Sequence, residues 1–226
     1  MSDDAKKRAG EKAAEYVESG QIVGLGTGST AYFAIVRLGA LVREGLDIKG
    51  IATSEASAAL AREQGIPLID FSVTDRIDVT IDGADEVDRS FNLIKGGGGA
   101  LLREKIVARA TETQIIVADE SKLKAQLGAF PLPVEITPFG WQATRARIRN
   151  LGCEPQLRMT NGDPFVTDNG NTILDCPFEA IPDPAELEKE LRSIPGVVEC
   201  GLFVALTDRV LIGKTDGTLL ELSETE

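Results

Sequence analysis

Short apolar runs and longer amphipathic stretches take turns along the first half of the chain. The short runs predict buried strands at residues 21–24, 49–53, 67–71, 76–81 and 114–118. The stretches with a helical period predict helices at residues 3–19, 31–44, 55–64 and 100–111. Strands separated by helix-length segments are typical of βαβ units. We therefore expect an α/β fold with a Rossmann-like open, mostly parallel sheet and helices on both faces.

The pattern changes at the segment Phe130-Pro-Leu-Pro-Val, whose prolines indicate a crossing into another domain. Beyond it we predict helices and strands of a different order: a helix at 141–150, hairpins about 168–170 and 216–217, a helix at 183–193 and a strand at 197–205. We expect a catalytic domain at 1–130 and 206–226. We expect a smaller α+β, ferredoxin-like domain at 131–205, which would form the oligomer contact.

Composition narrows the class of protein. No apolar run approaches the ~20 residues of a membrane span, and the N-terminus lacks a signal peptide, so a cytoplasmic location is expected. The chain has no histidine, which excludes a Ser-His-Asp triad, a histidine base and histidine metal sites. Its three cysteines form no C-x-x-C pair and are expected to be buried free thiols.

The formal net charge of −12 bears on the partners of the protein. Such a charge argues against nucleic acid and against an anionic membrane surface as the main partner. The acidic excess serves either solubility alone or adaptation to high salt, in which salt screens the self-repulsion. The sequence leaves both interpretations open.

Glycines and small hydroxyls join a predicted strand to a predicted helix at residues 24–30. Backbone N–H groups, the helix N-terminus and the hydroxyls of Thr27, Ser29 and Thr30 would together bind an anion. The spacing is G-x-G-x-G, so the dinucleotide fingerprint fails, and a phosphate-loop lysine is absent. A single phosphate monoester is the predicted ligand.

Two further junctions carry carboxylates. In the segment 53–57, Glu55 could hold a nucleotide ribose, but capping of the next helix by Ser54 or Thr53 is favoured. In the segment 82–88, Asp82 and Asp85 follow a buried strand and should point into the ligand crevice. These carboxylates would either hold a divalent metal or bind sugar hydroxyls and move protons.

The segment KGGGGALLREK at 95–105 and the segment DESK at 119–122 add candidate acid–base groups. Four consecutive glycines indicate a backbone that approaches a ligand. Lys95 and Lys122 can neutralise a growing oxyanion. Glu104 can act as a base if partial burial raises its pKa toward neutrality, although each of these side chains could also be an ordinary surface residue.

The ordered set GTGST, DGADEVD, KGGGGALLREK, DESK, PLPVEI, VTDNGN and IPGVVECGLF resembles ribose-5-phosphate isomerase of the A type, from about residue 5 to 217. The resemblance implies interconversion of ribose 5-phosphate and ribulose 5-phosphate without a metal or organic cofactor. It also implies a homodimer or homotetramer.

The resemblance also implies roles for individual residues. Glu104 matches the proton acceptor, Asp82, Asp85 and Lys95 are further catalytic candidates, and Lys6 weakly matches a phosphate-binding lysine. The implied substrate-binding residues are Thr27, Gly28, Ser29, Thr30, Asp82, Gly83, Ala84, Asp85, Lys95, Gly96, Gly97, Gly98 and Lys122.

Two rival functions were weighed against this interpretation. A transcription regulator that senses sugar phosphates needs a helix-turn-helix, whereas the residues before 21 leave room for one helix. A coenzyme A transferase would use a glutamate as nucleophile, and no second half that would bind the coenzyme is evident. The isomerase is therefore the expected function.

Overall fold

A computed structural model of the protein describes residues 3–223, so the outermost residues of the expected catalytic domain, 1–2 and 224–226, lie outside it. The chain forms two compact units. Unit 1 comprises residues up to 84, 103–123 and from 206 onward, and unit 2 comprises residues 85–102 and 124–205. Residues 85–102 and 124–130 thus group with the smaller unit, whereas the sequence placed them in the catalytic domain. The sequence and the structure both place a boundary after residue 205.

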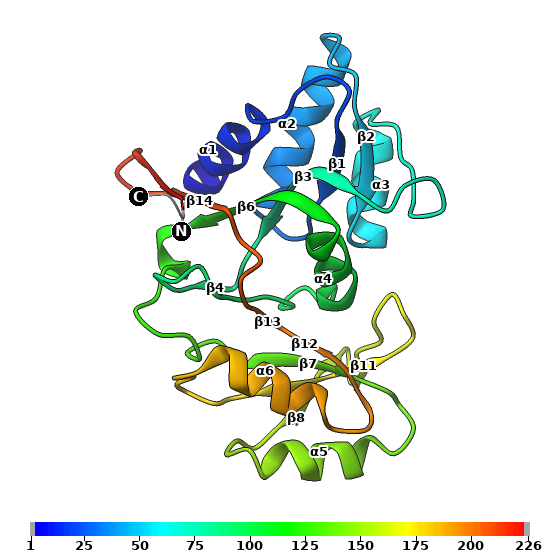
Figure 1. Ribbon diagram of the computed structural model, residues 1–226, viewed down its shortest axis with the longest axis vertical. Helices are drawn as coiled ribbons and strands as arrows, with labels where there is room; N and C mark the ends of the chain where they lie inside the picture. The colour runs from blue at the N-terminus through cyan, green and yellow to red at the C-terminus, as the bar shows by residue number, and fades with distance from the viewer. Residues whose placement is uncertain (1–2, 224–226) are drawn as a thin grey trace. The chain divides into compact units, whose positions relative to one another are not determined.

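Unit 1 is built on a six-stranded sheet with the order β15-β14-β6-β3-β1-β2 (Figure 1). Its strands are β1 (Ile22–Leu25), β2 (Lys49–Ala52), β3 (Ile77–Gly83), β6 (Thr111–Asp119), β14 (Arg209–Gly213) and β15 (Leu219–Ser223). All neighbouring pairs are parallel except β14 and β15, which form the C-terminal hairpin. This arrangement confirms the mostly parallel sheet.

Helices cover both faces of this sheet. They are α1 (Asp3–Ala14), α2 (Ala31–Arg43), α3 (Glu55–Glu63), α4 (Leu101–Arg109) and the short 3-10 helix η1 (Glu120–Lys122). One core cluster joins Ala9 of α1 and Leu38 of α2 to Val23 of β1. A smaller cluster joins Val107 of α4 to Ile77 of β3. The α/β fold class is therefore confirmed.

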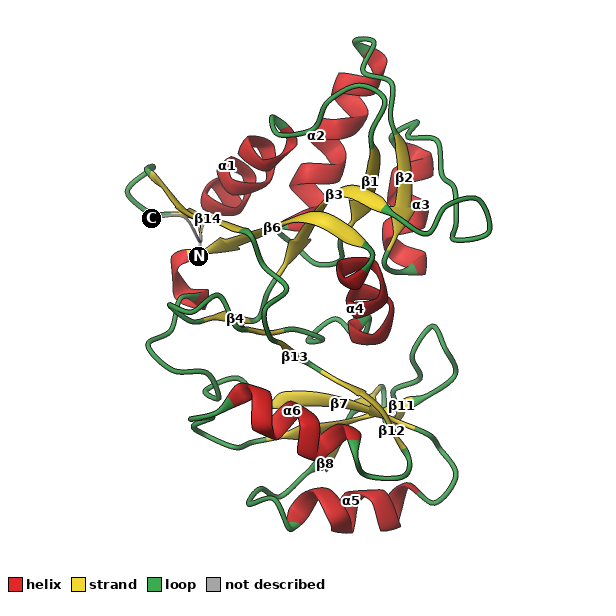
Figure 2. Ribbon diagram, in the orientation of Figure 1, coloured by secondary structure: helices red, strands yellow, loops and turns green. Residues whose placement is uncertain are grey.

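Unit 2 contains a four-stranded sheet with the order β12-β7-β11-β8 (Figure 2). Its elements follow the chain as β7 (Leu132–Ile136), α5 (Trp141–Arg149), β8 (Gln156–Leu157), β11 (Thr172–Cys176), α6 (Pro184–Arg192) and β12 (Val197–Cys200). The order βαββαβ with antiparallel pairs is the ferredoxin-like arrangement. Small ladders complete the unit: β4 (Glu86–Val87), β5 (Leu93–Ile94) and β13 (Leu202–Phe203), and β9 (Met159–Thr160) with β10 (Asp163–Pro164).

Three predicted elements were wrong in extent. The first helix ends at Ala14, because the next N–H groups bond to carbonyls three residues back and tighten the chain. The predicted strand 67–71 is a single bridge at Leu68, since Asp70 accepts bonds from Ser72 and turns the chain. The predicted strand 197–205 is broken at Gly201 into β12 and β13.

No strand was predicted in the proline-rich segment 130–134, whereas β7 occupies residues 132–136 and pairs with strands on both sides. Proline lacks the N–H that a central strand donates. Pro133 is tolerated because β12 ends at Cys200, beside it, and the next carbonyl, Gly201 O, accepts from Lys95 N at 2.8 Å and so needs no donor from Pro133.

Cysteine burial and membrane topology complete the description. Cys153, Cys176 and Cys200 are buried free thiols, as predicted. Between residues 3 and 223, no helix has both the length and the apolar character needed to cross a bilayer.

Candidate active site

The parallel strands of unit 1 bring several predicted motifs to one edge of the sheet. β1 lies between β2 and β3. Successive strands are therefore added on one side of β1 and then on the other, although all three strands are parallel. Ligands of open α/β sheets bind beyond the carboxyl ends of the strands at such a switch point. The segment 26–30 follows β1, and Asp82 lies near the end of β3. Ser54 and Lys122 follow β2 and β6.

The loop after β1 is fastened to Asp82. This carboxylate is fully buried, and its Oδ1 accepts from Thr27 N at 3.0 Å and from Gly83 N at 2.7 Å. A Cβ at residue 26 would lie 2.3 Å from the same oxygen, so only glycine fits there. Asp82 therefore orders the loop through backbone bonds, a role that the motif alone did not predict.

The hydroxyl of Thr27 belongs to a cluster of small hydroxyls. Thr27 Oγ1 lies 2.7 Å from Thr53 Oγ1 and 2.8 Å from Ser54 Oγ. Ser57 Oγ donates to Gly26 O at 2.6 Å. Ser54 also caps α3 by accepting from Ser57 N, which confirms the predicted cap. The sequence expected the Thr27 hydroxyl to face a ligand, but in this structure it faces the junction between β2 and α3.

The rest of the loop is more open. Gly28, with a φ of +114°, and Ser29 are exposed, and Thr30 is buried at the start of α2. The side chain of Thr30 makes no cap hydrogen bond. Exposed backbone at the N-terminus of α2 is suited to an anion, because the first N–H groups of a helix lack partners within the helix.

In unit 2, Asp85 and the glycine segment hold one another. Asp85 Oδ2 accepts from Gly97 N at 2.7 Å, and a Cβ at residue 97 would lie 2.5 Å from Asp85 Oδ1. Gly96 and Gly99 have φ values of +102° and +84°. The segment therefore needs glycine for both its conformation and its contacts.

Lys95 is 2% exposed although it is a lysine. Its backbone N donates to Gly201 O at 2.8 Å, and its Nζ lies 5.4 Å from the centre of the Phe203 ring. The face of an aromatic ring is one of the few partners that a lysine amine can have among apolar side chains. The sequence assigned a role to Lys95, but nothing in it pointed to Phe203.

Arg158 and Phe165, which sequence reasoning missed, contact the same glycine segment. Arg158 Nη1 donates to Gly96 O at 2.9 Å and to Gly97 O at 3.2 Å. The Arg158 guanidinium also forms a two-pronged pair with Asp175 and lies 5.8 Å from the Phe165 ring. A Cβ at Gly99 would lie 2.4 Å from that ring, which explains the fourth glycine. No sequence signal links these positions, since they are some 60 residues apart.

Three other predicted side chains belong to unit 1. Glu104 lies in the first turn of α4 and is 4% exposed, so it is not an ordinary surface carboxylate. Lys122 ends η1 and is half-buried. Lys6, on α1, is also half-buried. A Cβ at Gly213 would lie 1.9 Å from Ala5 O, so the start of α1 packs against the end of β14.

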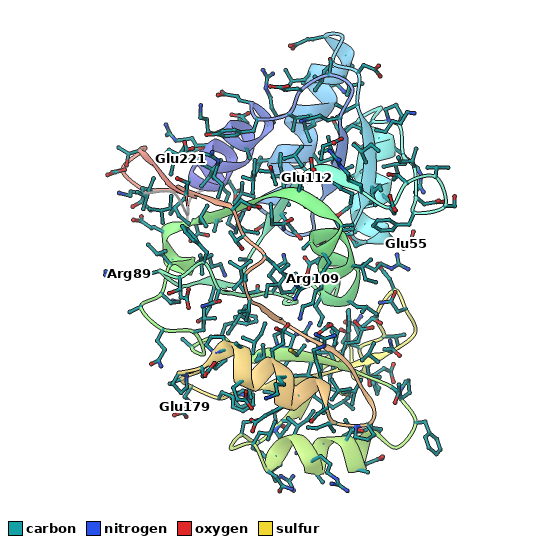
Figure 3. All side chains as sticks on the ribbon, viewed as in Figure 1. Glu55, Arg89, Arg109, Glu112, Glu179 and Glu221 are labelled. Carbon is teal, nitrogen blue, oxygen red and sulfur yellow. The ribbon has the colours of Figure 1, made fainter. Side chains whose placement is uncertain are left out.

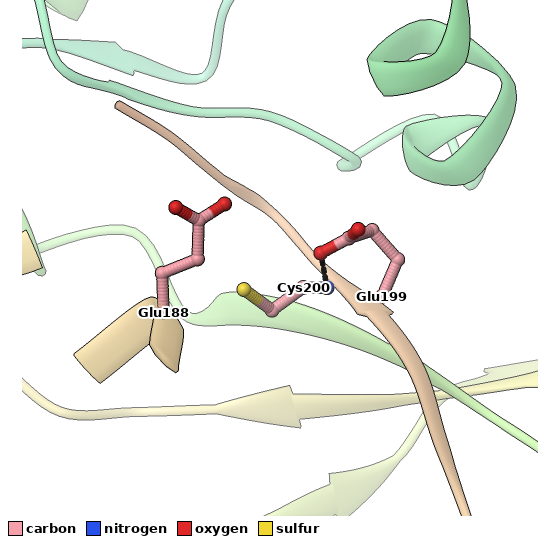
Figure 4. A group of neighbouring side chains, drawn as sticks. All are labelled: Glu188, Glu199 and Cys200. Carbon is pink, nitrogen blue, oxygen red and sulfur yellow. Dashed lines mark hydrogen bonds between the residues drawn. The ribbon is translucent and has the colours of Figure 1, made fainter. Parts of the chain in front are cut away.

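One group of possible metal ligands lies within residues 3–223. The ligand atoms of Glu188, Glu199 and Cys200 lie within 4.8 Å of one another, on α6 and β12 (Figure 4). Glu199 Oε1 accepts from Cys200 N at 2.9 Å, and its Oε2 is 3.7 Å from Arg192 Nε. These contacts account for the buried Glu199 carboxylate without an ion. In the predicted motifs, Asp82 and Asp85 likewise accept backbone N–H groups.

An open α/β sheet with an anion-suited loop and buried carboxylates is typical of an enzyme that acts on small anionic substrates. A family model described as ribose 5-phosphate isomerase A (phosphoriboisomerase A) matches residues 49–217. The chain belongs to the ribose 5-phosphate isomerase A family, which confirms the resemblance.

Curated relatives and solved structures agree over nearly the full length. A ribose-5-phosphate isomerase A of Oceanobacillus iheyensis is 51% identical, with 97% of this chain and 98% of that protein covered. The ribose 5-phosphate isomerase structure from Plasmodium falciparum has a TM-score of 0.94 at 42% identity, with both chains covered completely. A structure of a D-ribose-5-phosphate isomerase in complex with phospho-erythronic acid has a TM-score of 0.95 at 40% identity and covers 99% of this chain and 100% of that one.

Proposed function

We propose that this chain interconverts D-ribose 5-phosphate and D-ribulose 5-phosphate, a step of the non-oxidative branch of the pentose phosphate pathway. Family membership, with a curated relative that matches 97% of the chain, supports this reaction. The burial of Glu104 is the structural observation that carries the mechanism, because a surface carboxylate would not hold a fixed position against a sugar carbon. A related isomerase bound to phospho-erythronic acid supports a phosphorylated sugar chain as ligand.

The proposed chemistry needs one base. After the furanose ring opens, Glu104 takes the proton from C2, the C–H electrons form a C1–C2 double bond, and the carbonyl π electrons move onto the C1 oxygen. That oxygen either carries the negative charge or takes up the proton that the C2 hydroxyl gives up. The product is an enediol or enediolate. Loss of the C2 hydroxyl proton then forms the ketone, and Glu104 returns its proton to C1. A single carboxylate suffices, because both carbons lie on one face of the planar intermediate.

The other proposed roles follow from local environments. Asp82 and Asp85 would assist ring opening by moving hydroxyl protons. Lys95 and Lys122 would stabilise negative charge on the sugar oxygens. The backbone of Gly83, Ala84, Gly96, Gly97 and Gly98 would approach those oxygens, with the donors being N–H groups other than those of Gly83 and Gly97, which bond to Asp82 and Asp85. Thr27, Gly28, Ser29 and Thr30 would bind the phosphate. No step requires a metal or an organic cofactor.

A rate measurement tests the base. Glu104→Gln should lose about 10²–10⁴ in kcat while still binding substrate. Glu18→Gln is the matched control, because Glu18 is an exposed carboxylate of unit 1, and it should keep full activity. Wild-type activity should survive excess EDTA. Retained turnover in Glu104→Gln would transfer the base to another residue, and complete loss in chelator would refute the metal-free mechanism.

We also propose that unit 2 forms the contact of a homodimer or homotetramer. Phe139, in the loop before α5, is 95% exposed, and Val166 is 62% exposed. Large apolar side chains at such exposure suit a protein interface. Phe139→Asp should lower the mass measured by light scattering, whereas Val73→Asp in unit 1, also exposed, should not. An unchanged mass in Phe139→Asp would place the contact elsewhere.

A cytoplasmic location is proposed as well. The three cysteines are buried and form no disulfide with one another, which suits a reducing compartment. Cell fractionation should recover the isomerase activity with cytoplasmic markers, and recovery with secreted proteins would contradict the assignment.

A further inference from the structure

A cavity of about 570 Å³ lies in unit 1, outside the residues assigned to the reaction. It is lined by the end of β2, by α3, by residues 68–71 and by α4, and it opens to solvent. Apolar side chains line much of it: Ile51, Leu68, Ile69, Ile106 and Val107. Phe71, also in the lining, and Ile106 are exposed by 41% and 49%, so apolar surface stays open to solvent here. Volume and lining are those of a small-molecule site, for which ~300–1,000 Å³ is usual.

Four charged residues contribute to the lining. Arg103 Nη1 and Glu55 Oε1 form a salt bridge at 2.9 Å; Figure 3 labels Glu55. Asp70 Oδ1 accepts from the Ser72 hydroxyl and from Ser72 N, the latter at 2.8 Å, and these two bonds lower the pKa of Asp70. Arg62 is the fourth charged residue of the lining. Its guanidinium forms no hydrogen bond or ion pair within residues 3–223.

We propose that this cavity binds a small organic anion with a flat apolar body, whose carboxylate or phosphate pairs with Arg62. The apolar body of the ligand would pack against the apolar lining and cover the exposed part of the Phe71 ring. The guanidinium would supply two parallel N–H donors to the anionic group. The pairing of the other lining charges leaves Arg62 as the cation available to a ligand.

The cavity adjoins residues of the proposed reaction site. Ser54 lines the cavity, and its Oγ accepts from Thr27 Oγ1 at 2.8 Å. Arg103 also lines it and directly precedes Glu104. A ligand that displaces Ser54 would therefore move Thr27, so occupancy should raise the KM for ribose 5-phosphate about fivefold. This coupling rests on the proposed function, whereas binding itself does not.

Calorimetry with 2-naphthoate and its neutral amide, 2-naphthamide, tests binding without substrate. The carboxylate should bind more tightly than the amide. Arg62→Gln should weaken 2-naphthoate about tenfold, and Arg62→Lys should recover part of that loss. Arg37→Gln, an arginine on α2 outside the lining, is the control and should bind as the wild type does. Equal binding of both compounds, no binding at millimolar concentration, or an equal loss in Arg37→Gln would overturn the proposal.

Two further measurements separate the remaining outcomes. If 2-naphthoate binds but the KM of an active enzyme is unchanged, the coupling through Ser54 is wrong and the site stands. If the chain lacks isomerase activity, calorimetry still decides the site, so the two failures are distinguishable. Sedimentation velocity with and without 2-naphthoate tests for a second copy on this surface. A change of mass would mean that another chain covers the cavity, which would overturn the small-molecule proposal.

Discussion

Arg158→Gln should separate the two tasks of the arginine that holds the glycine segment. The wild-type guanidinium donates from Nε to Asp175 Oδ2 at 2.9 Å and from Nη1 to Gly96 O at 2.9 Å. Glutamine has neither the length nor the number of donors to make both sets of bonds. The substitution therefore removes an ion pair and also frees the backbone that is proposed to bind substrate oxygens.

The expected loss of stability follows from exposure. The side chains of Arg158 and Asp175 are 14% and 27% exposed, which places the pair between surface and buried ion pairs. Surface pairs contribute ~0–1 kcal/mol and breaking a fully buried pair costs ~3–5 kcal/mol, so about 2 kcal/mol is expected here. A loss of this size leaves most of the protein folded.

The expected loss of activity follows from the glycine segment. Its carbonyls lose two charge-assisted bonds, and glycines without such bonds sample many conformations. If these bonds stabilise the ordered conformation of the glycine segment by about 1.4–2.8 kcal/mol, their loss lowers kcat/KM about 10- to 100-fold. The effect should appear mainly in kcat, because oxyanion stabilisation acts on the transition state.

Arg145→Gln is the matched control. Arg145 donates from Nη2 to Glu154 Oε1 at 2.6 Å and from Nε to Pro155 O at 2.8 Å, so it combines an ion pair with a carbonyl contact as Arg158 does. Its partners lie after α5, not in the glycine segment. Urea unfolding and initial rates with ribose 5-phosphate should show a stability loss in both variants and an activity loss in Arg158→Gln alone. Equal activities in the two variants would refute the reasoning.

Three further expectations concern the loop, unit 2 and the surface. Gly26→Ala should lower kcat/KM at least about tenfold, because its Cβ would lie 2.3 Å from Asp82 Oδ1 and push the loop away. Glu86→Gln should lower the free energy of unfolding in urea by ~1–3 kcal/mol, since its buried carboxylate accepts from Gly128 N at 2.8 Å and Phe130 N at 2.7 Å. If the net charge of −12 reflects a high-salt habitat, the unfolding temperature should climb steeply toward molar KCl.

Each of these expectations has a clear contrary result. Normal kinetics in Gly26→Ala would show that the loop moves without loss of function. An unfolding midpoint unchanged by Glu86→Gln would mean that water or another group replaces its bonds. A flat thermal response to salt would leave solubility as the role of the acidic surface.

Much of the fold was accessible from local patterns. The predicted helices at 31–44 and 55–64 match α2 and α3 to within a residue at each end, because their apolar spacing and flanking glycines are local signals. The strand β7 was not predicted, because no local signal shows that β12 ends beside Pro133 and that Gly201 O accepts from Lys95 N there. The short strands β4 and β5 were not predicted either, because a strand of two residues is too short to show a periodic pattern and forms only by pairing with its neighbour.

The candidate site divides in the same way. The motifs singled out Glu104, Asp82 and Lys95 by residue type and by position after strands, and the structure buries all three side chains. Residues that act on the motifs without belonging to one, such as Arg158 and Phe203, carried no local signal. Their contacts exist because chain segments far apart in sequence meet in unit 2.

The sequence by itself determined the α/β class, the order of the motifs and the family, because hydrophobic period, turn chemistry and ordered motifs are all local properties of the chain. Only the tertiary structure decided that the Thr27 hydroxyl faces α3, that Glu104 is buried and that Arg158 holds the glycine segment. The physical reason is that burial and hydrogen-bond partners depend on which segments pack together. A residue's neighbours along the chain do not specify that packing.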